Sequence, residues 1–120
     1  MAENKNCIKA PIKKGEDVRA FMKGAAFFSK LSRRRRVFEK VCVIQIFLAI
    51  AVSIEGAEVN DLQSLQEDTG LNKQRLSEGL KLLVAEGIIR WVALGTPKFI
   101  NRCYRLDEDG REIYQKFLND

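Results

Sequence analysis

Histidine is absent from the 120 residues of this chain, and its absence excludes several kinds of chemistry. Without an imidazole there is no Ser-His-Asp or Cys-His nucleophile and no histidine general base. The three cysteines (Cys7, Cys42 and Cys103) are widely spaced and form no C-x-x-C pair, which excludes a zinc site built from local pairs. Their odd number and wide spacing also argue against a disulfide framework and for a reducing compartment.

Phosphate-binding glycine motifs are missing as well. No two of the eight glycines are separated by a single residue and Gly-Lys-Ser/Thr does not occur, so the sequence has neither G-x-G-x-x-G nor a P-loop. The acidic residues lie mostly in helical surface patterns, and none forms an isolated pair in an apolar setting. We therefore expect a protein that is not an enzyme and that holds no metal and no cofactor.

Basic residues are concentrated in the first third of a chain whose length suits one domain. Residues 1–40 hold 12 basic and 4 acidic side chains, and residues 41–120 hold 9 and 12, which gives net charges of +8 and −3. A basic segment on a near-neutral body suits a polyanionic partner. The same basic segment would bind an acidic membrane surface equally well.

The first third predicts a flexible basic tail, an amphipathic helix and an arginine run. Residues 1–14 are polar and basic, as a mobile tail would be. Residues 16–32 place Val18, Phe21, Met22, Ala25, Phe28 and Leu31 at helical spacing, so this helix packs on its own domain, on a second subunit or on a lipid surface. The run Arg33–Arg36 is either a solubilising charge cluster or an anchor for phosphates.

Residues 41–54 form the longest apolar stretch, with only Gln45 and Ser53 as exceptions. As a helix this stretch spans roughly 21 Å at ~1.5 Å per residue, which is short of the ~30 Å hydrocarbon core of a bilayer. The length predicts a buried core helix. One small domain covers one face of it, and the other face meets the amphipathic helix, a second subunit or both.

Residues 59–91 predict two helices joined by a tight glycine turn. Val59, Leu62 and Leu65 have helical spacing, with Asn60 as the expected N-cap and Gly70 as the C-cap glycine. Asn72 is expected to cap the next helix, which ends before Gly87 and whose buried side carries Leu76, Leu80, Leu83 and Val84. Gly79 is unfavourable inside a helix, and we expect it to permit close approach of a neighbouring helix.

A hairpin and a final helix complete the pattern. Residues 88–93 and 100–106 predict two strands, with Gly95 and Pro97 as turn residues and Lys98 near the tip. Three basic residues lie on the arms (Arg90, Arg102 and Arg105), and the aromatic residues of the strands are expected to pack there (Trp91, Phe99 and Tyr104). Asp107 is expected to cap a helix with Ile113, Phe117 and Leu118 on one side.

This order of elements resembles the winged helix-turn-helix domains of small bacterial and archaeal transcription regulators such as the MarR and PadR families. The matching motifs are L-x-x-x-T-G-L, S-x-x-L-x-x-L, E-G-I-I and L-D-x-x-G-R-x-x-Y, all within residues 59–118. The resemblance implies a mainly α fold with a small β-hairpin wing (α+β), a winged helix-turn-helix with additional N-terminal helices. The expected organisation is a tail (1–14), N-terminal helices (15–54) and a winged helix-turn-helix domain (55–120).

The resemblance also implies a dimeric, cytoplasmic and nucleoid-associated DNA-binding transcriptional regulator, with an effector that the sequence does not identify. Helix 72–86 would enter the major groove, and the hairpin near 95–99 would touch backbone or minor groove. The homodimer would form through the N- and C-terminal helices, residues 16–54 and 107–118. The candidate DNA-binding residues are Asn72, Lys73, Gln74, Arg75, Ser77, Glu78, Lys81, Lys98, Arg102, Arg33, Arg34, Arg35 and Arg36.

Two features keep other interpretations open. Glu78 places a carboxylate where it repels phosphate, although it can accept a hydrogen bond from cytosine N4, and residues 41–120 are net negative. Both favour a winged helix that binds a protein or RNA in a transcription, replication or ribosomal assembly. The polar face of helix 72–86 would then be an ordinary solvated face. A membrane-associated protein acting through residues 16–54 is a third hypothesis, which the short apolar run disfavours.

Overall fold

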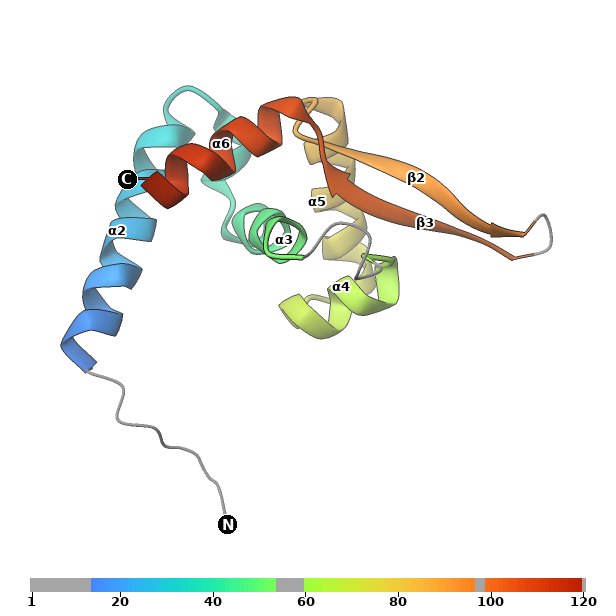
Figure 1. Cartoon of the computed structure of the whole chain (residues 1–120), viewed down its shortest axis with the longest axis horizontal. Helices are drawn as coiled ribbons and strands as arrows, with labels where there is room; N and C mark the ends of the chain where they lie inside the picture. The colour runs from blue at the N-terminus through green and yellow to red at the C-terminus, as the bar shows by residue number, and fades with distance from the viewer. Residues whose placement is uncertain (1–13, 54–59, 97–98, 120) are drawn as a thin grey trace, which may run out of the picture.

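The computed structural model describes residues 14–53, 60–96 and 99–119. Over these ranges the chain forms five α-helices, one 3-10 helix and a two-stranded antiparallel sheet (Figure 1). In chain order they are α2 (Lys14–Ser32), η1 (Arg36–Glu39), α3 (Val41–Ala51), α4 (Leu62–Thr69), α5 (Lys73–Ala85), β2 (Ile89–Thr96), β3 (Phe99–Leu106) and α6 (Glu108–Asn119). The prediction of a mainly α protein with a hairpin is confirmed. The predicted tail lies outside the described residues, apart from Lys14, at which α2 begins.

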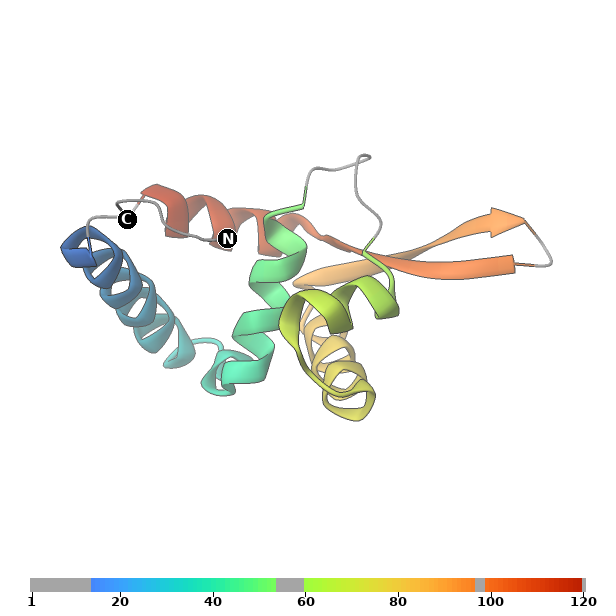
Figure 2. The same ribbon diagram turned by 90° about the horizontal axis from the view of Figure 1, so that it is seen from below.

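Helix α3 lies at the centre of the molecule. Figure 2 shows it between α6 on one side and α4 and α5 on the other, with the hairpin pointing away from α2. Helix α3 packs directly on both α4 and α5. Helices from the N-terminal part and from the later part of the chain therefore share one core, and the predicted boundary at residues 54–55 lies outside the described residues.

The apolar stretch forms the core, as predicted. Four side chains of α3 are buried, namely Val43, Ile46, Phe47 and Ile50. Phe47 is at the centre of an aromatic cluster, with its ring centroid 5.4 Å from that of Phe38 and 6.1 Å from that of Phe28. Through these contacts α3 holds η1 and α2 against the helix-turn-helix unit. In the part of the chain that the structure describes, no helix has both the length and the apolarity needed to cross a bilayer.

Gly79 lies where α5 crosses α3. A Cβ atom at this position would overlap with Cδ1 of Ile46, and Cγ2 of Val43 would be only 3.8 Å away. The close crossing of the two helices accounts for a glycine in a helix interior, where it costs ~1 kcal/mol relative to alanine. The expectation that Gly79 has a packing role is confirmed.

The turn between α4 and α5 follows the capping pattern read from the sequence. Gly70 ends α4 with φ 72°, in the left-handed region that glycine adopts without strain. The side chain of Asn72 then caps α5 by accepting a hydrogen bond from the backbone N–H of Arg75, at 2.8 Å. These two residues set the angle at which α5 leaves α4.

Asn60 is not the N-cap of α4, so that prediction was wrong. Asp61 caps the helix instead, because its Oδ1 accepts a hydrogen bond from the backbone N–H of Ser64 at 2.8 Å. Asn60 is buried and bonds elsewhere: its Oδ1 accepts from the Ser53 hydroxyl at 2.8 Å, and its carbonyl accepts from the Tyr104 N–H at 3.0 Å. It therefore joins the end of α3 to the hairpin.

The hairpin is longer than predicted. Strand β2 pairs with β3 from Ile89↔Leu106 out to Thr96↔Phe99, so Gly95 lies within a strand and is not a turn residue. The predicted turn residue Pro97 and the tip residue Lys98 lie outside the described residues. Trp91 is 45% exposed and packs within the hairpin, against Arg102 of the other strand.

The two terminal helices are less completely buried than their apolar faces predicted. Phe28 and Leu31 of α2 and Ile113 of α6 are buried. Met22 of α2 is 65% exposed and Leu118 of α6 is 56% exposed. The expectation that Leu118 shares the packed side of its helix was therefore wrong for the single chain.

Arg35 connects three elements and differs in this from the other arginines of its run. Its guanidinium donates a hydrogen bond to the carbonyl of Glu86 at 2.9 Å, at the C-terminal end of α5. The same group lies 3.7 Å from the carboxylates of Glu86 and of Asp109. A cation is favourable where the last carbonyls of a helix have no partner within it. Arg35 thus links the η1 segment to α5 and α6.

We expect Arg35→Gln to lower the free energy of unfolding by about 1–2 kcal/mol, because a hydrogen bond from a charged donor contributes roughly that much when partly shielded from water. Arg34→Gln is the matched control, since Arg34 is exposed and its change should stay within about 0.5 kcal/mol. Urea denaturation of both variants measures the difference. Equal stability of the two variants would show that the Arg35 contacts contribute nothing.

Candidate nucleic-acid interface

The outward face of α5 is polar over its first three turns. Leu76, Gly79, Leu80 and Leu83 are buried against the core. Successive residues of a helix are rotated by about 100°, so the opposite face is centred on Gln74, Glu78, Lys81 and Ala85, all of which are exposed. Lys73 and Arg75 project from the two sides of this face, with Gln74 between them.

One side of α5 faces the hairpin across a recess of about 640 Å³, which we call the hairpin-side recess. Its lining is mostly polar and comes from α4, α5, β3 and the residue that caps α4: Asp61, Leu62, Gln63, Gln66, Lys73, Ser77, Asn101, Arg102 and Tyr104. The carboxylate of Asp61 is occupied by its cap bonds to Ser64. The recess presents two cations, this carboxylate and several neutral hydrogen-bonding groups to an incoming ligand.

Arg102 is held in place by the indole of Trp91. The guanidinium carbon lies 4.4 Å from the ring centroid, within the range of a cation–π contact. Side chains alternate along a strand, and the pairing of Ala93 with Arg102 and of Trp91 with Tyr104 puts all four on the same face of the hairpin. With Ser77 and Lys81, three of them line a smaller recess against α5. The exposed tryptophan thus orients a cation beside α5.

The other side of α5 faces the beginning of α3. A recess of about 190 Å³, which we call the α3-side recess, is lined by Lys40, Cys42, Val43, Arg75, Glu78, Gly79 and Leu82. Lys40 and Arg75 are both exposed, as is Glu78. Among the ion pairs of the described residues, none involves these three side chains. The two cations face solvent together with one carboxylate.

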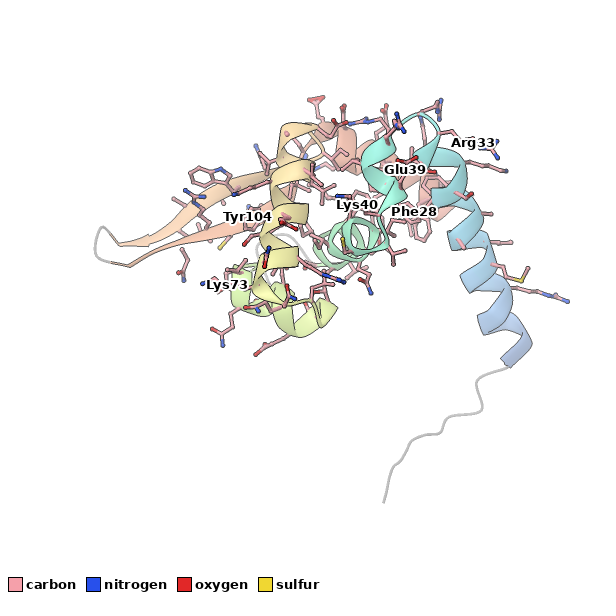
Figure 3. The ribbon with its side chains drawn as sticks, turned by 180° about the vertical axis from the view of Figure 1, so that it is seen from behind. Phe28, Arg33, Glu39, Lys40, Lys73 and Tyr104 are labelled. Carbon is pink, nitrogen blue, oxygen red and sulfur yellow. The ribbon has the colours of Figure 1, made fainter. Side chains whose placement is uncertain are left out.

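The predicted arginine run is not a uniform surface. Arg33 and Arg34 are exposed, Arg36 lies 3.7 Å from Glu39, and Arg35 makes the contacts described above. Because Arg35 touches the C-terminal end of α5, the run is about 20 Å along that helix from Lys73. Figure 3 shows Arg33 and Lys73 well apart, with Lys40 between them.

The structure brings some of the predicted residues together and not others. Lys73, Ser77, Lys81 and Arg102 lie around the hairpin side of α5. The side chain of Asn72 is used as a helix cap, and Lys98 lies outside the described residues. Sequence reasoning missed Lys40, Gln63, Gln66 and Asn101. The i, i+3 spacing of the two glutamines could have indicated an exposed face of α4, whereas only the tertiary structure places Lys40 beside α5.

The two cysteines of the described residues differ in exposure. Cys103 is buried, and burial raises the pKa of its thiol, with a smaller contribution from the carboxylate of Asp61. A raised pKa favours the thiol over the nucleophilic thiolate. Cys42 is half-buried, and Cys7 lies outside the described residues.

Comparison with known proteins identifies the fold. A scan against protein-family models finds no match, and a search of curated proteins finds none. Among solved structures, the reduced form of the transcriptional regulator YodB from B. subtilis superposes with a TM-score of 0.59 and 18% identity, covering 75% of this chain and 83% of that one. A protein classed in the MarR family of transcriptional regulators from Porphyromonas gingivalis superposes with a TM-score of 0.58 and 16% identity, and the match covers 74% of this chain and 82% of that one.

A third structure is described as homodimeric. It is the winged helix-turn-helix DNA-binding domain of a possible ArsR-family transcriptional regulator from Mycobacterium bovis, with a TM-score of 0.52 and 15% identity, covering 94% of this chain and 85% of that one. At these identities the likeness establishes the fold. The chain has the winged helix-turn-helix fold, in which α3, α4 and α5 form the three-helix unit and β2–β3 is the wing.

Proposed function

We propose that this protein is a DNA-binding transcriptional regulator that acts as a homodimer. Helix α5 enters the major groove, and the hairpin, including its tip near residues 95–99, contacts the adjacent backbone or minor groove. The observation that carries the proposal is the outer surface of α5, where Gln74 is exposed and where Lys73 and Lys81 each line a recess with Arg102 of the hairpin. Side chains of these types bind phosphates and base edges.

The structural neighbours support this proposal. Those named above are described as transcriptional regulators, one of them through a DNA-binding domain. The exposed arginines of the run, Arg33, Arg34 and Arg36, would add phosphate contacts that carry no sequence information.

Binding to a random-sequence duplex across a range of salt concentrations, combined with selection of preferred sites from a random pool, tests the proposal. We expect a steep salt dependence, because cations displace counterions from DNA. We also expect an enriched inverted repeat whose half-sites lie about one helical turn apart, ~34–36 Å. Absence of duplex binding at low salt would refute the proposal.

Gln74 is the residue from which we expect sequence discrimination. A glutamine can form two hydrogen bonds with adenine, and a good pair of this kind contributes about 1–3 kcal/mol of discrimination. Gln74→Ala should therefore relax selectivity at one position of each half-site by roughly 5- to 150-fold while leaving the salt dependence unchanged. Gln115→Ala, an exposed change on α6, is the control. An unchanged binding-site profile for Gln74→Ala would exclude base contact by this residue.

The dimer interface is proposed to involve α2 and α6. Met22 and Leu118 expose 65% and 56% of their surface, and Val41 at the start of α3 exposes 69%. A groove of about 620 Å³ lies between α2 and α3, where it is lined by apolar side chains including Ala25, Phe28, Ile44 and Leu48, with Phe117 from α6. Exposed apolar surface of this kind marks an interaction site, and a second copy of the chain would cover it.

Met22→Glu combined with Leu118→Glu should convert a dimer into a monomer, because two carboxylates would be buried without partners. Sedimentation velocity measures the change, with Gln115→Glu on α6 as a control for added charge. A wild-type chain that sediments as a monomer at all concentrations would contradict the dimer. Unaltered dimerisation of the double variant would place the interface elsewhere.

A second function is supported by Glu78. Its carboxylate stands in the centre of the exposed face of α5, and residues 41–120 carry a net charge of −3. Both features suit a winged helix that binds a protein or RNA. Tight binding to such a partner, with only weak binding to duplex DNA, would favour this function over the first.

A further inference from the structure

The α3-side recess combines two cations from different elements on the flank of α5 that faces away from the hairpin. Lys40 precedes α3 and Arg75 lies in the first turn of α5, and both line the same recess of about 190 Å³. Because α3 and α5 cross closely at Gly79, the backbone positions from which the two side chains project are fixed relative to each other. Their neighbours within the recess are the thiol of Cys42 and the carboxylate of Glu78.

The dimensions of the major groove give these cations a partner. The groove is about 12 Å wide, and an α-helix with its side chains has a diameter of about 10–12 Å. A helix seated in the groove therefore has a sugar-phosphate backbone along each of its two sides. Lys73 and Arg102 stand on one side of α5, at the hairpin-side recess, and Arg75 and Lys40 stand on the other.

We propose that Lys40, with Arg75, binds a phosphate of the DNA strand that borders the major groove on the side away from the hairpin. This inference rests on the proposed DNA-binding function and adds a residue that sequence reasoning did not select. The two flanks of α5 then each provide two cations and one carboxylate, with Asp61 on the hairpin side and Glu78 on the α3 side. The helix is held from both edges of the groove, so its outward residues face the bases.

Glu78 limits how close a phosphate approaches this recess. Glu78 lies nearer the centre of the outward face than Arg75 does, because the two positions are about 60° apart around the helix and Arg75 is at the edge of that face. A phosphate on the outer edge of the recess meets Arg75 and Lys40, while Glu78 points toward the base pairs. There it can accept a hydrogen bond from cytosine N4.

The test is the salt dependence of binding to the selected duplex for wild type, Lys40→Gln and the matched control Lys116→Gln, an exposed lysine of α6. Loss of one phosphate contact should reduce the slope of log affinity against log salt by about one and weaken binding roughly 3- to 10-fold near 0.1 M salt. The preferred sequence should not change, because phosphate contacts carry no sequence information. A wild-type slope for Lys40→Gln would overturn the inference.

A neutral phosphate analogue identifies the contact independently. Methylphosphonates placed singly around the half-site should weaken wild-type binding at positions on both borders of the groove. Lys40→Gln should lose its sensitivity at one of these borders only. If the wild-type protein binds duplex and is insensitive to methylphosphonates on the border away from the hairpin, the inference fails while the proposed function stands. If the wild-type protein does not bind duplex, the proposed function itself fails.

Cys42 offers a direct readout of whether DNA covers the recess. In a Cys7→Ser variant, the half-buried Cys42 thiol should react with iodoacetamide, and Cys103 is too buried to compete. Saturating duplex should slow the alkylation of Cys42 several-fold. An alkylation rate that duplex leaves unchanged would show that no DNA strand lies over the recess.

Discussion

Phe47→Ala is expected to lower the free energy of unfolding by about 3–5 kcal/mol, which is typical for removing a fully buried phenylalanine. Phe47 has no exposed surface, and its ring contacts Phe28 of α2, Phe38 of η1 and Tyr114 of α6. No smaller side chain can hold all three partners at once. The total free energy of unfolding of a domain is about 5–15 kcal/mol, so this substitution removes a large part of it.

Thermal and urea denaturation at a fixed chain concentration measure this effect, since the apparent stability of a dimer depends on concentration. The midpoint of thermal unfolding should fall by more than about 10 °C. Val52→Ala, at the C-cap of the same helix, is the control, because Val52 is 63% exposed and its change should stay within about 0.5 kcal/mol. A loss below about 1 kcal/mol for Phe47→Ala would contradict the central position of this ring.

The double reversal Lys73→Glu/Arg102→Glu is expected to weaken binding to any duplex by roughly 100-fold or more near 0.1 M salt. Two phosphate contacts are lost and two repulsive charges take their place, and each lost contact lowers the salt slope by about 0.9. The two cations come from α5 and β3 and line one recess. Reversing them affects the helix and the hairpin contacts together.

The control for this variant is Lys23→Glu/Lys116→Glu, which changes the net charge by the same amount on exposed positions of α2 and α6. Both variants should be compared by fluorescence anisotropy after their oligomeric state has been checked. If the two double variants lose affinity equally, the effect is one of overall charge. A position-specific DNA surface on α5 and the hairpin would then be excluded.

The helices of the winged-helix unit could be predicted from the sequence because their determinants are local. The ends of α5 follow from Asn72 and Gly87, and the buried leucines of α5 lie at helical spacing. Gly79 could be interpreted as a packing residue because nothing local favours glycine inside a helix. The structure supplies only its partner, Ile46.

The predictions that were wrong or missing concern residues whose roles depend on contacts between distant parts of the sequence. Asn60 and Asp61 are both good cap residues, and the burial of Asn60 against the hairpin determines which of them caps α4. The four adjacent arginines look equivalent in the sequence, yet Arg35 alone among them reaches Glu86, 51 residues away. The position of Lys40 beside α5 likewise depends on how α3 packs. Residues of the interface that come from different elements could therefore not be grouped from the sequence.

The most direct test of the account is a titration of the ¹⁵N-labelled protein with the selected duplex, followed by amide chemical shifts. We expect the largest changes in α5 from Lys73 to Lys81 and in β3 from Asn101 to Tyr104, with a second group at Lys40. The amide signals of α2 and α6, which lie away from the bound DNA, should shift little. Changes confined to α2 or α6, with α5 unaffected, would contradict DNA recognition by the outward face of α5.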